Sequence, residues 1–105
     1  MADLYRAISD PIRRRILQLL AEGERTQTEL VQQFSISQPA VKKHIDLLLE
    51  EQLILERKDG KYRCYRLNTP VFRRCYRRLQ SEIGFIMELT LSQMKHYVEG
   101  SSEDD

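Results

Sequence analysis

Residues 37–51 constrain the fold most, because they combine a helix start, one apolar stripe and a cationic tip. Ser37 can cap the helix, and Pro39 falls in the first turn, where its missing N–H leaves no hydrogen bond unmade. At about 100° per residue, the apolar side chains share one side of the helix: Val41, Ile45, Leu48 and Leu49. Ala40 and Lys43 fall on the opposite side, so the outward tip is small and cationic.

A second predicted helix lies just before this segment. Thr26-Gln27-Thr28-Glu29 is a capping box that starts it, and residues 34–37 form the short link. Two helices joined by a tight turn, the second with a small cationic tip, are typical of a helix-turn-helix that enters a DNA major groove. We interpret residues 37–51 as a recognition helix. An ordinary amphipathic surface helix with solvated lysines is the alternative interpretation.

Two helices are predicted before residue 26. Asp3 can cap a short helix from Leu4 to Ile8, and Asp10-Pro11 starts a helix that runs to about Glu22. Gly23 is expected to end that helix as a left-handed residue. The three consecutive arginines, Arg13, Arg14 and Arg15, splay around the helix, so solvated side chains with one acid partner are favoured over base contacts.

After residue 51 the apolar pattern changes to strand-like runs at residues 53–58 and 61–67 around Asp59-Gly60. Asp-Gly predicts a two-residue hairpin with positive φ at both positions. Its tip is cationic, and a basic hairpin after a recognition helix is typical of a wing that contacts phosphates. The predicted fold is therefore mainly α with a small β-hairpin, a winged helix-turn-helix. The alternative is a solvated hairpin whose lysines protect exposed strand edges.

A last helix is predicted from about residue 70 to 98, beginning at Thr69-Pro70. Its stripe at helical spacing comprises Phe72, Cys75, Tyr76, Leu79, Ile83, Ile86, Met94 and Tyr97. Such a helix is roughly 43 Å long at ~1.5 Å per residue, which is too long for this domain to cover. The simplest partner is the same helix of a second copy. Gly84 is compatible with either a close helix contact or a break in this helix. We expect residues 1–98 to form a single domain and residues 99–105 to form a disordered acidic tail.

Charge is unevenly distributed along the 105 residues, although the net charge is only +1. Residues 57–78 contain 9 Lys+Arg and 1 Asp+Glu, a net charge of +8 between two acidic blocks. Such a basic block suits a polyanionic partner.

No apolar run approaches the ~20 residues of a membrane span, so no membrane insertion is expected. Two cysteines without metal-ligand spacing favour a reducing, cytoplasmic location. No catalytic grouping is visible, so neither an enzyme nor a cofactor is expected.

Three segments together resemble the ArsR/SmtB family of bacterial winged-helix repressors: residues 7–17, residues 37–45 and Tyr65-Arg66-Leu67-Asn68. The resemblance covers about residues 4–83. It implies operator binding and repression by a homodimer whose first and last helices form the interface, usually relieved by a metal ion or another signal. The interface residues we assign on this basis are Leu4, Ile8, Phe72, Cys75, Leu79, Ile83 and Ile86.

The metal sites of that family are not matched. Where many members have a Cys-x-Cys pair, this chain has Thr26-Gln27-Thr28, and hydroxyls do not replace thiolates for soft metals. The positions aligned with ligands on the last helix hold Thr69, Val71, Glu82 and Phe85. The chain therefore resembles the branch without metal sensing, which includes SdpR-like autorepressors, and no metal residue is assigned.

The leading hypothesis is a dimeric repressor that reads double-stranded DNA at a pseudo-palindrome. Gln38 and Lys43 are assigned to base edges, and Ala40 to close approach. The remaining DNA-binding assignments are Ser35, Ser37, Pro39, Lys42 and His44 on the helix-turn-helix, with Arg57, Lys58, Lys61 and Arg63 on the wing. Two alternatives stay open: a thiol switch through Cys64 and Cys75, and a protein-interaction module using the last helix. The inducer or protein partner is unidentified.

Overall fold

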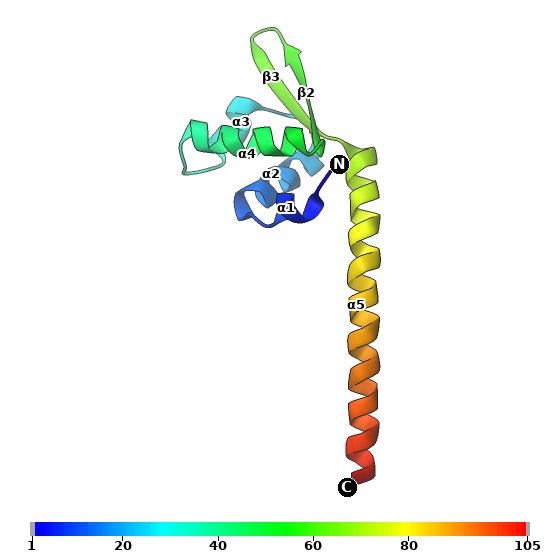
Figure 1. The fold of residues 1–105 in the computed structure, drawn as a ribbon. Coiled ribbons are helices and arrows are strands. Elements are labelled where there is room, and N and C mark those ends of the chain that lie inside the picture. Colours follow the sequence, from blue (N-terminus) through cyan, green and yellow to red (C-terminus); the bar gives the residue numbers. More distant parts are fainter. Residues whose placement is uncertain (1, 105) are drawn as a thin grey trace.

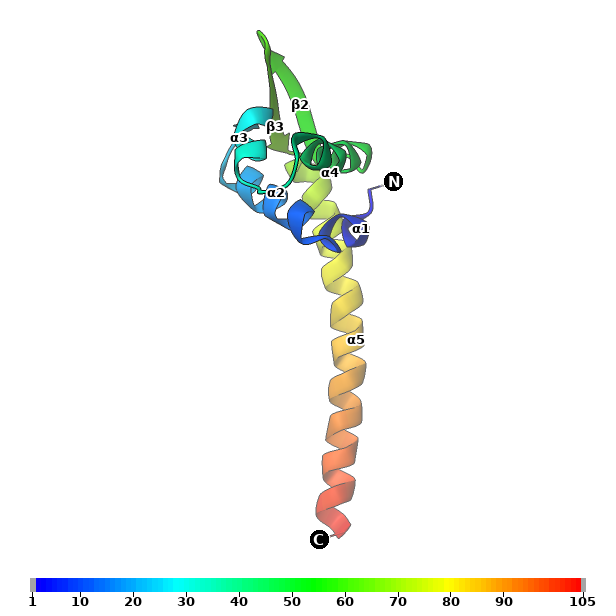
Figure 2. The same cartoon turned by 90° about the vertical axis from the view of Figure 1, so that its left-hand side faces the viewer.

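The computed structural model describes the backbone of residues 2–104 and the side chains of residues 2–95. A head of short elements sits at one end of a single long helix, which runs away from the head in both views (Figure 1, Figure 2). The elements are α1 (Leu4–Ile8), α2 (Pro11–Glu22), β1 (Arg25–Thr26), α3 (Gln27–Gln32), α4 (Gln38–Glu50), β2 (Ile54–Asp59), β3 (Tyr62–Leu67) and α5 (Thr69–Asp104). The predicted mainly α fold with a hairpin wing is confirmed.

The predicted helix starts are confirmed by their hydrogen bonds. The Asp3 carboxylate accepts from the Arg6 amide, and Thr26 and Glu29 make the reciprocal bonds of the capping box. The Ser37 hydroxyl accepts from the Ala40 amide at 3.3 Å. These hydrogen bonds satisfy amides that an isolated helix start leaves unpaired. Each of these three helices therefore begins directly after its capping residue.

The sheet has three strands in the order β1-β3-β2, all antiparallel, rather than the two strands expected. The additional strand β1 is two residues long and pairs Arg25 with Tyr65 and Thr26 with Cys64. Two residues are too few to show alternation, so the sequence carries no strand pattern there. β1 connects the start of α3 to the base of the wing.

The wing turn lies one residue later than predicted. Asp59 pairs with Tyr62 in the ladder, so Gly60 and Lys61 form the turn. Of these two, only Gly60 has a positive φ, at 62°. A glycine at the first central position is the requirement of a type II′ turn, and the expectation of positive φ at both Asp59 and Gly60 is wrong.

The core of the head lies between α2, α4 and the base of the sheet. Tyr65 on β3 is fully buried, and its hydroxyl donates to the Gln27 side chain at 3.2 Å. Burial raises the pKa of Tyr65. The other fully or almost fully buried side chains are Ala7, Ile16, Leu19, Leu20, Leu30, Val41, Ile45, Leu48, Leu53 and Ile54. The predicted apolar stripe of α4 thus supplies three of the central contacts.

The last helix is longer than predicted. α5 is one continuous helix that ends at Asp104 instead of about residue 98, so residues 99–104 are helical rather than a disordered tail, and Asp105 lies outside the described residues. Gly84 does not break it, because one glycine costs only about 1 kcal/mol relative to alanine. A Cβ at Gly84 would meet nothing within 4 Å in this chain. No helix in the described part of the chain is long and apolar enough to cross a bilayer.

Candidate nucleic-acid interface

The tip of α4 and the link before it form an exposed, mostly small and polar surface. Ser35, Ser37, Gln38 and Pro39 are exposed, and Ala40 is half-buried. Behind them Val41 is fully buried and fixes the helix against the head. The structure therefore brings together the residues assigned to base edges and phosphates at one free helix end.

The two lysines of this helix differ in their surroundings. Lys42 forms an ion pair with Asp46, one turn later. Lys43 is exposed and has no hydrogen-bond or ion-pair partner among the described residues. Lys43 is thus available to an external acceptor without first breaking an intramolecular contact.

His44 on α4 contacts the start of α2. Its Nδ1 is 3.2 Å from a guanidinium nitrogen of Arg13, and its Nε2 is 4.0 Å from a carboxylate oxygen of Asp10. Only 22% of the His44 side chain is exposed. The ring packs α4 against the start of α2, and the assignment of His44 to DNA stays a prediction.

Arg13 and Arg14 cap the end of α1, a role that the sequence analysis missed. The Arg13 guanidinium donates to the carbonyl oxygens of Ala7 at 3.1 Å and Arg6 at 2.8 Å, while Arg14 donates to the carbonyl of Ile8. These are the carbonyls that a helix end leaves without partners. A clue was available, since a helix as short as residues 4–8 followed at once by Asp10-Pro11 has no glycine to end it.

The wing cations divide into paired and unpaired groups. Arg57 binds Glu24 through two hydrogen bonds of 2.9 and 2.6 Å. This contact raises the pKa of Arg57 and lowers the pKa of the Glu24 carboxyl. Arg63 lies 3.6 Å from a carboxylate oxygen of Glu56. Two of the four assigned wing cations are therefore already partly neutralised within the chain.

Lys58 and Lys61 are the remaining wing cations. Lys58 is exposed and has no ion-pair partner among the described residues. Lys61 lies over the Tyr62 ring, 5.4 Å from its centroid, a cation–π contact that keeps the ammonium exposed. Together with Lys43 they are the assigned cations that carry an uncompensated charge at this surface.

The residues assigned to a dimer interface lie on α1 and α5 but differ in exposure. Leu4 is only 5% exposed and already belongs to the chain's own core. Four are partly buried against that core: Ile8, Phe72, Cys75 and Leu79. Ile83 and Ile86 are 50% and 61% exposed. The stripe is therefore partly used within the chain, and its outer part is uncovered.

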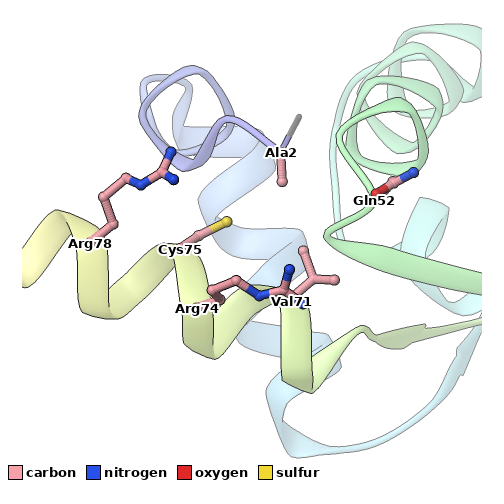
Figure 3. A pocket seen from close by; sticks show the side chains of 6 residues that line it. All are labelled: Ala2, Gln52, Val71, Arg74, Cys75 and Arg78. Atoms are coloured by element: carbon pink, nitrogen blue, oxygen red, sulfur yellow. The ribbon is translucent and has the colours of Figure 1, made fainter.

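A small cavity of about 150 Å³ lies between the N-terminal segment, the end of α4 and α5 (Figure 3). The sulfur of Cys75 points into it, and Arg74 and Arg78 lie on the same helix face. Cys64 is buried on β3, so the two thiols lie on different elements. Within residues 2–95, no three His, Cys, Asp or Glu side chains gather in a way that holds a metal ion.

Comparison with known proteins places this geometry among bacterial regulators. The family model described as "Bacterial regulatory protein, arsR family" matches residues 10–55. The chain is 38% identical over 71 residues to the transcriptional repressor SdpR of Bacillus subtilis (strain 168), which covers 68% of this chain and 79% of SdpR. It is 39% identical over 69 residues to a probable mercury resistance operon repressor of Streptomyces lividans, covering 66% of this chain and 55% of that protein.

A solved structure agrees with these sequence matches. The crystal structure of a possible transcriptional regulator for arsenical resistance superposes with a TM-score of 0.71 at 34% identity, covering 77% of this chain and 84% of the other. The chain spans only about half the length of the Streptomyces lividans protein. The residues matched by the family model run from the start of α2 to the start of β2 and include the helix-turn-helix.

Proposed function

The chain belongs to the ArsR family of bacterial regulatory proteins, whose members are DNA-binding transcriptional regulators and not enzymes, and we propose that it represses transcription as a homodimer on a pseudo-palindromic operator, without a metal inducer. The observation that carries this proposal is the exposed tip of α4, where Gln38 and Lys43 are free of intramolecular partners. Glutamine pairs with adenine and lysine donates to guanine acceptors in the major groove.

In this proposal, the wing supplies the contacts that do not depend on the DNA sequence. Lys58 and Lys61 at the hairpin tip suit phosphate oxygens, and Ser35 and Ser37 suit phosphates beside the recognition helix. Arg57 and Arg63 contribute less in this proposal, because each already has a carboxylate partner. We therefore expect the two wing lysines to contribute more to DNA affinity than the two wing arginines.

Dimerisation is supported by the uncovered part of the α5 stripe. Ile83 and Ile86 continue the line of Phe72, Cys75 and Leu79 along one helix side. Covering this line with a second copy would place two recognition helices on one side of the DNA, about 34 Å apart. Such a pair reads an inverted repeat.

Absence of a metal inducer is proposed from the donor groups. The Thr26 hydroxyl already accepts the Glu29 amide in the capping box, and a neutral hydroxyl is a poor ligand for soft metals. Val71 and Phe85 on α5 carry no donor atom. Thr26 therefore serves helix capping, Val71 packs against the core, and neither α5 residue can ligate a metal ion.

Selection of bound duplexes from a random pool tests this function directly. The expected result is enrichment of an inverted repeat whose half-sites are one helical turn apart, with an affinity that does not change when zinc ion or arsenite is added. Enrichment of no sequence, or of a single half-site only, would contradict the dimeric repressor. A loss of affinity on adding either species would contradict the proposal that no metal acts as inducer.

A further inference from the structure

All side chains of the outer part of α5, residues 83–95, are exposed in this chain. Seven of its side chains are large, apolar and at least half exposed: Ile83, Phe85, Ile86, Met87, Leu89, Leu91 and Met94. Among the described side chains, the last hydrogen bond between α5 and the head is at Glu82, whose carboxylate accepts from the Tyr5 hydroxyl. Beyond that point the helix runs on alone in both views (Figure 1, Figure 2). Such a concentration of exposed apolar groups marks an interaction surface.

One dimer seam does not cover this surface. Ile83 and Ile86 continue the line of Phe72, Cys75 and Leu79, which we call the inner stripe. At about 100° per residue, Phe85 and Leu89 lie roughly 80–120° to one side of this stripe. Met87 and Leu91 lie roughly as far to the other side. The opposite, polar side carries Glu88, Ser92 and Lys95, while Thr90 and Gln93 fall between apolar residues on the line of Ile83 and Ile86. A helix that is apolar around most of its circumference is stable only when it is buried by more than one neighbour.

We propose that residues 83–95 of α5 join two dimers of this chain into a tetramer, in which each outer helix packs against more than one other copy. The inference rests on the proposed dimer, since the seam through Ile83 and Ile86 is taken as the first contact. The second contact is made by the side of α5 that carries Phe85 and Leu89. Four-helix packing of this type buries apolar positions that a two-helix seam leaves in water.

Charge favours a second copy as the occupant of this surface. Residues 83–95 contain one acid, Glu88, and one base, Lys95, so two copies of the segment do not repel each other. The start of α5 carries Arg73, Arg74, Arg77 and Arg78, whereas residues 79–105 contain six Asp+Glu and one Lys. When two such helices pack antiparallel, the basic start of each faces the acidic end of the other. The chain is thus complementary to itself.

Mass measurement of the full chain by analytical ultracentrifugation tests this assembly. The wild type is expected to be a tetramer, and the double variant Phe85→Glu with Leu89→Glu is expected to be a dimer that still binds one operator. Lys95→Glu is the matched control, because it changes the net charge by the same −2 on the polar side of the helix, and it is expected to remain a tetramer. Phe85→Ala with Leu89→Ala repeats the test without added charge.

Each result has a distinct consequence. A wild type that is a dimer over the whole concentration range, or an acidic double variant that stays tetrameric, would overturn the tetramer and leave the dimeric repressor intact. A monomeric wild type would overturn the dimer as well. Thermal unfolding checks that each variant is folded. Two duplexes with different fluorophores, brought together by the wild type and not by the double variant, would support the tetramer by a second readout.

Discussion

Lys43 and Lys42 are neighbours in sequence, yet we expect different consequences when they are removed. Lys43 has no partner among the described residues, whereas Lys42 is paired with Asp46. Lys43→Ala should weaken binding to a selected operator by roughly 1–3 kcal/mol and relax specificity at one base pair. Lys42→Ala is the matched control and should cost less, because its charge is already partly compensated. Fluorescence anisotropy on operator and single-substitution duplexes measures both effects, and equal losses for the two variants would remove the assignment of Lys43.

The wing offers a second pair of residues for comparison. Lys58→Ala should weaken binding to all sequences alike and make the slope of log affinity against log salt shallower by about 0.9. Arg57→Ala should change the slope less, because Glu24 holds the guanidinium through two hydrogen bonds. Titrations at several salt concentrations measure the slopes. A larger change for Arg57 than for Lys58 would show that the contact with Glu24 opens when DNA binds.

Asp10 makes stability depend on pH. Partial burial alone would raise the pKa of this carboxyl, but hydrogen bonds from the backbone amides of Arg13 and Ile12 bring it below its ordinary value of 3.8. The pKa of Asp10 is lower in the folded than in the unfolded protein. The carboxylate therefore stabilises the fold at pH values above the unfolded pKa, and this stabilisation is lost as the pH falls through the folded pKa. Asp10→Ala should cost about 0.5–2 kcal/mol at neutral pH.

Asp10→Asn separates the cap from its charge. Asparagine caps helices about as well as aspartate but does not titrate in this range, so Asp10→Asn should lose less stability than the wild type between neutral pH and about pH 3. Urea unfolding at each pH measures the free energy of unfolding. Identical pH profiles for the wild type and Asp10→Asn would show that other carboxyl groups dominate the acid sensitivity.

At the scale of the elements, the end of α4 is strained at one residue. Gln52 has a φ of 62°, and the amide of Leu53 donates to the carbonyl of Leu48 at 3.1 Å. This is the Schellman arrangement, in which the left-handed position is usually glycine. Gln52→Gly should therefore stabilise the fold by about 0.5–1 kcal/mol, since relief of strain exceeds the entropy cost of glycine.

The control for this prediction is Gln52→Ala. Alanine keeps the strain and removes only the exposed side chain, so its unfolding temperature should stay close to that of the wild type. The Asn68 side chain donates to the backbone carbonyl of residue 52, which both variants retain. If glycine and alanine change the unfolding temperature alike, the left-handed backbone is not the cause.

At the scale of the whole molecule, the proposed dimer makes operator spacing critical. Two recognition helices held at a fixed separation reach two half-sites only when these are one turn apart. Inserting about 5 base pairs, half a turn, between the half-sites should reduce affinity to that of a single half-site. Gel-shift titration with the selected operator and its lengthened form measures this. Equal affinities would mean that the two DNA-binding heads are not rigidly joined.

Much of the fold follows from interactions within a few residues, and these were predictable. Helices begin after Asp3, Thr26 and Ser37 because each side chain accepts a hydrogen bond from the amide three residues later. The stripe of α4 and the exposed position of Lys43 follow from helical periodicity alone. The order of helices and the presence of a wing were determined by such local patterns, as were the residues at the tip of α4.

Contacts between distant residues were decided only by the tertiary structure. Glu24 and Arg57 are 33 residues apart, and Arg13 and His44 are 31 apart, so no local pattern indicates either pair. These contacts decide which assigned cations already have a partner in the chain, and they hold the His44 ring against α2. The pairing of Asp59 with Tyr62 likewise moved the wing turn by one residue. Sequence alone thus determined where the helices start and which of their sides is apolar, because those depend on neighbours along the chain. The structure decided which charges meet, because that depends on how the elements pack.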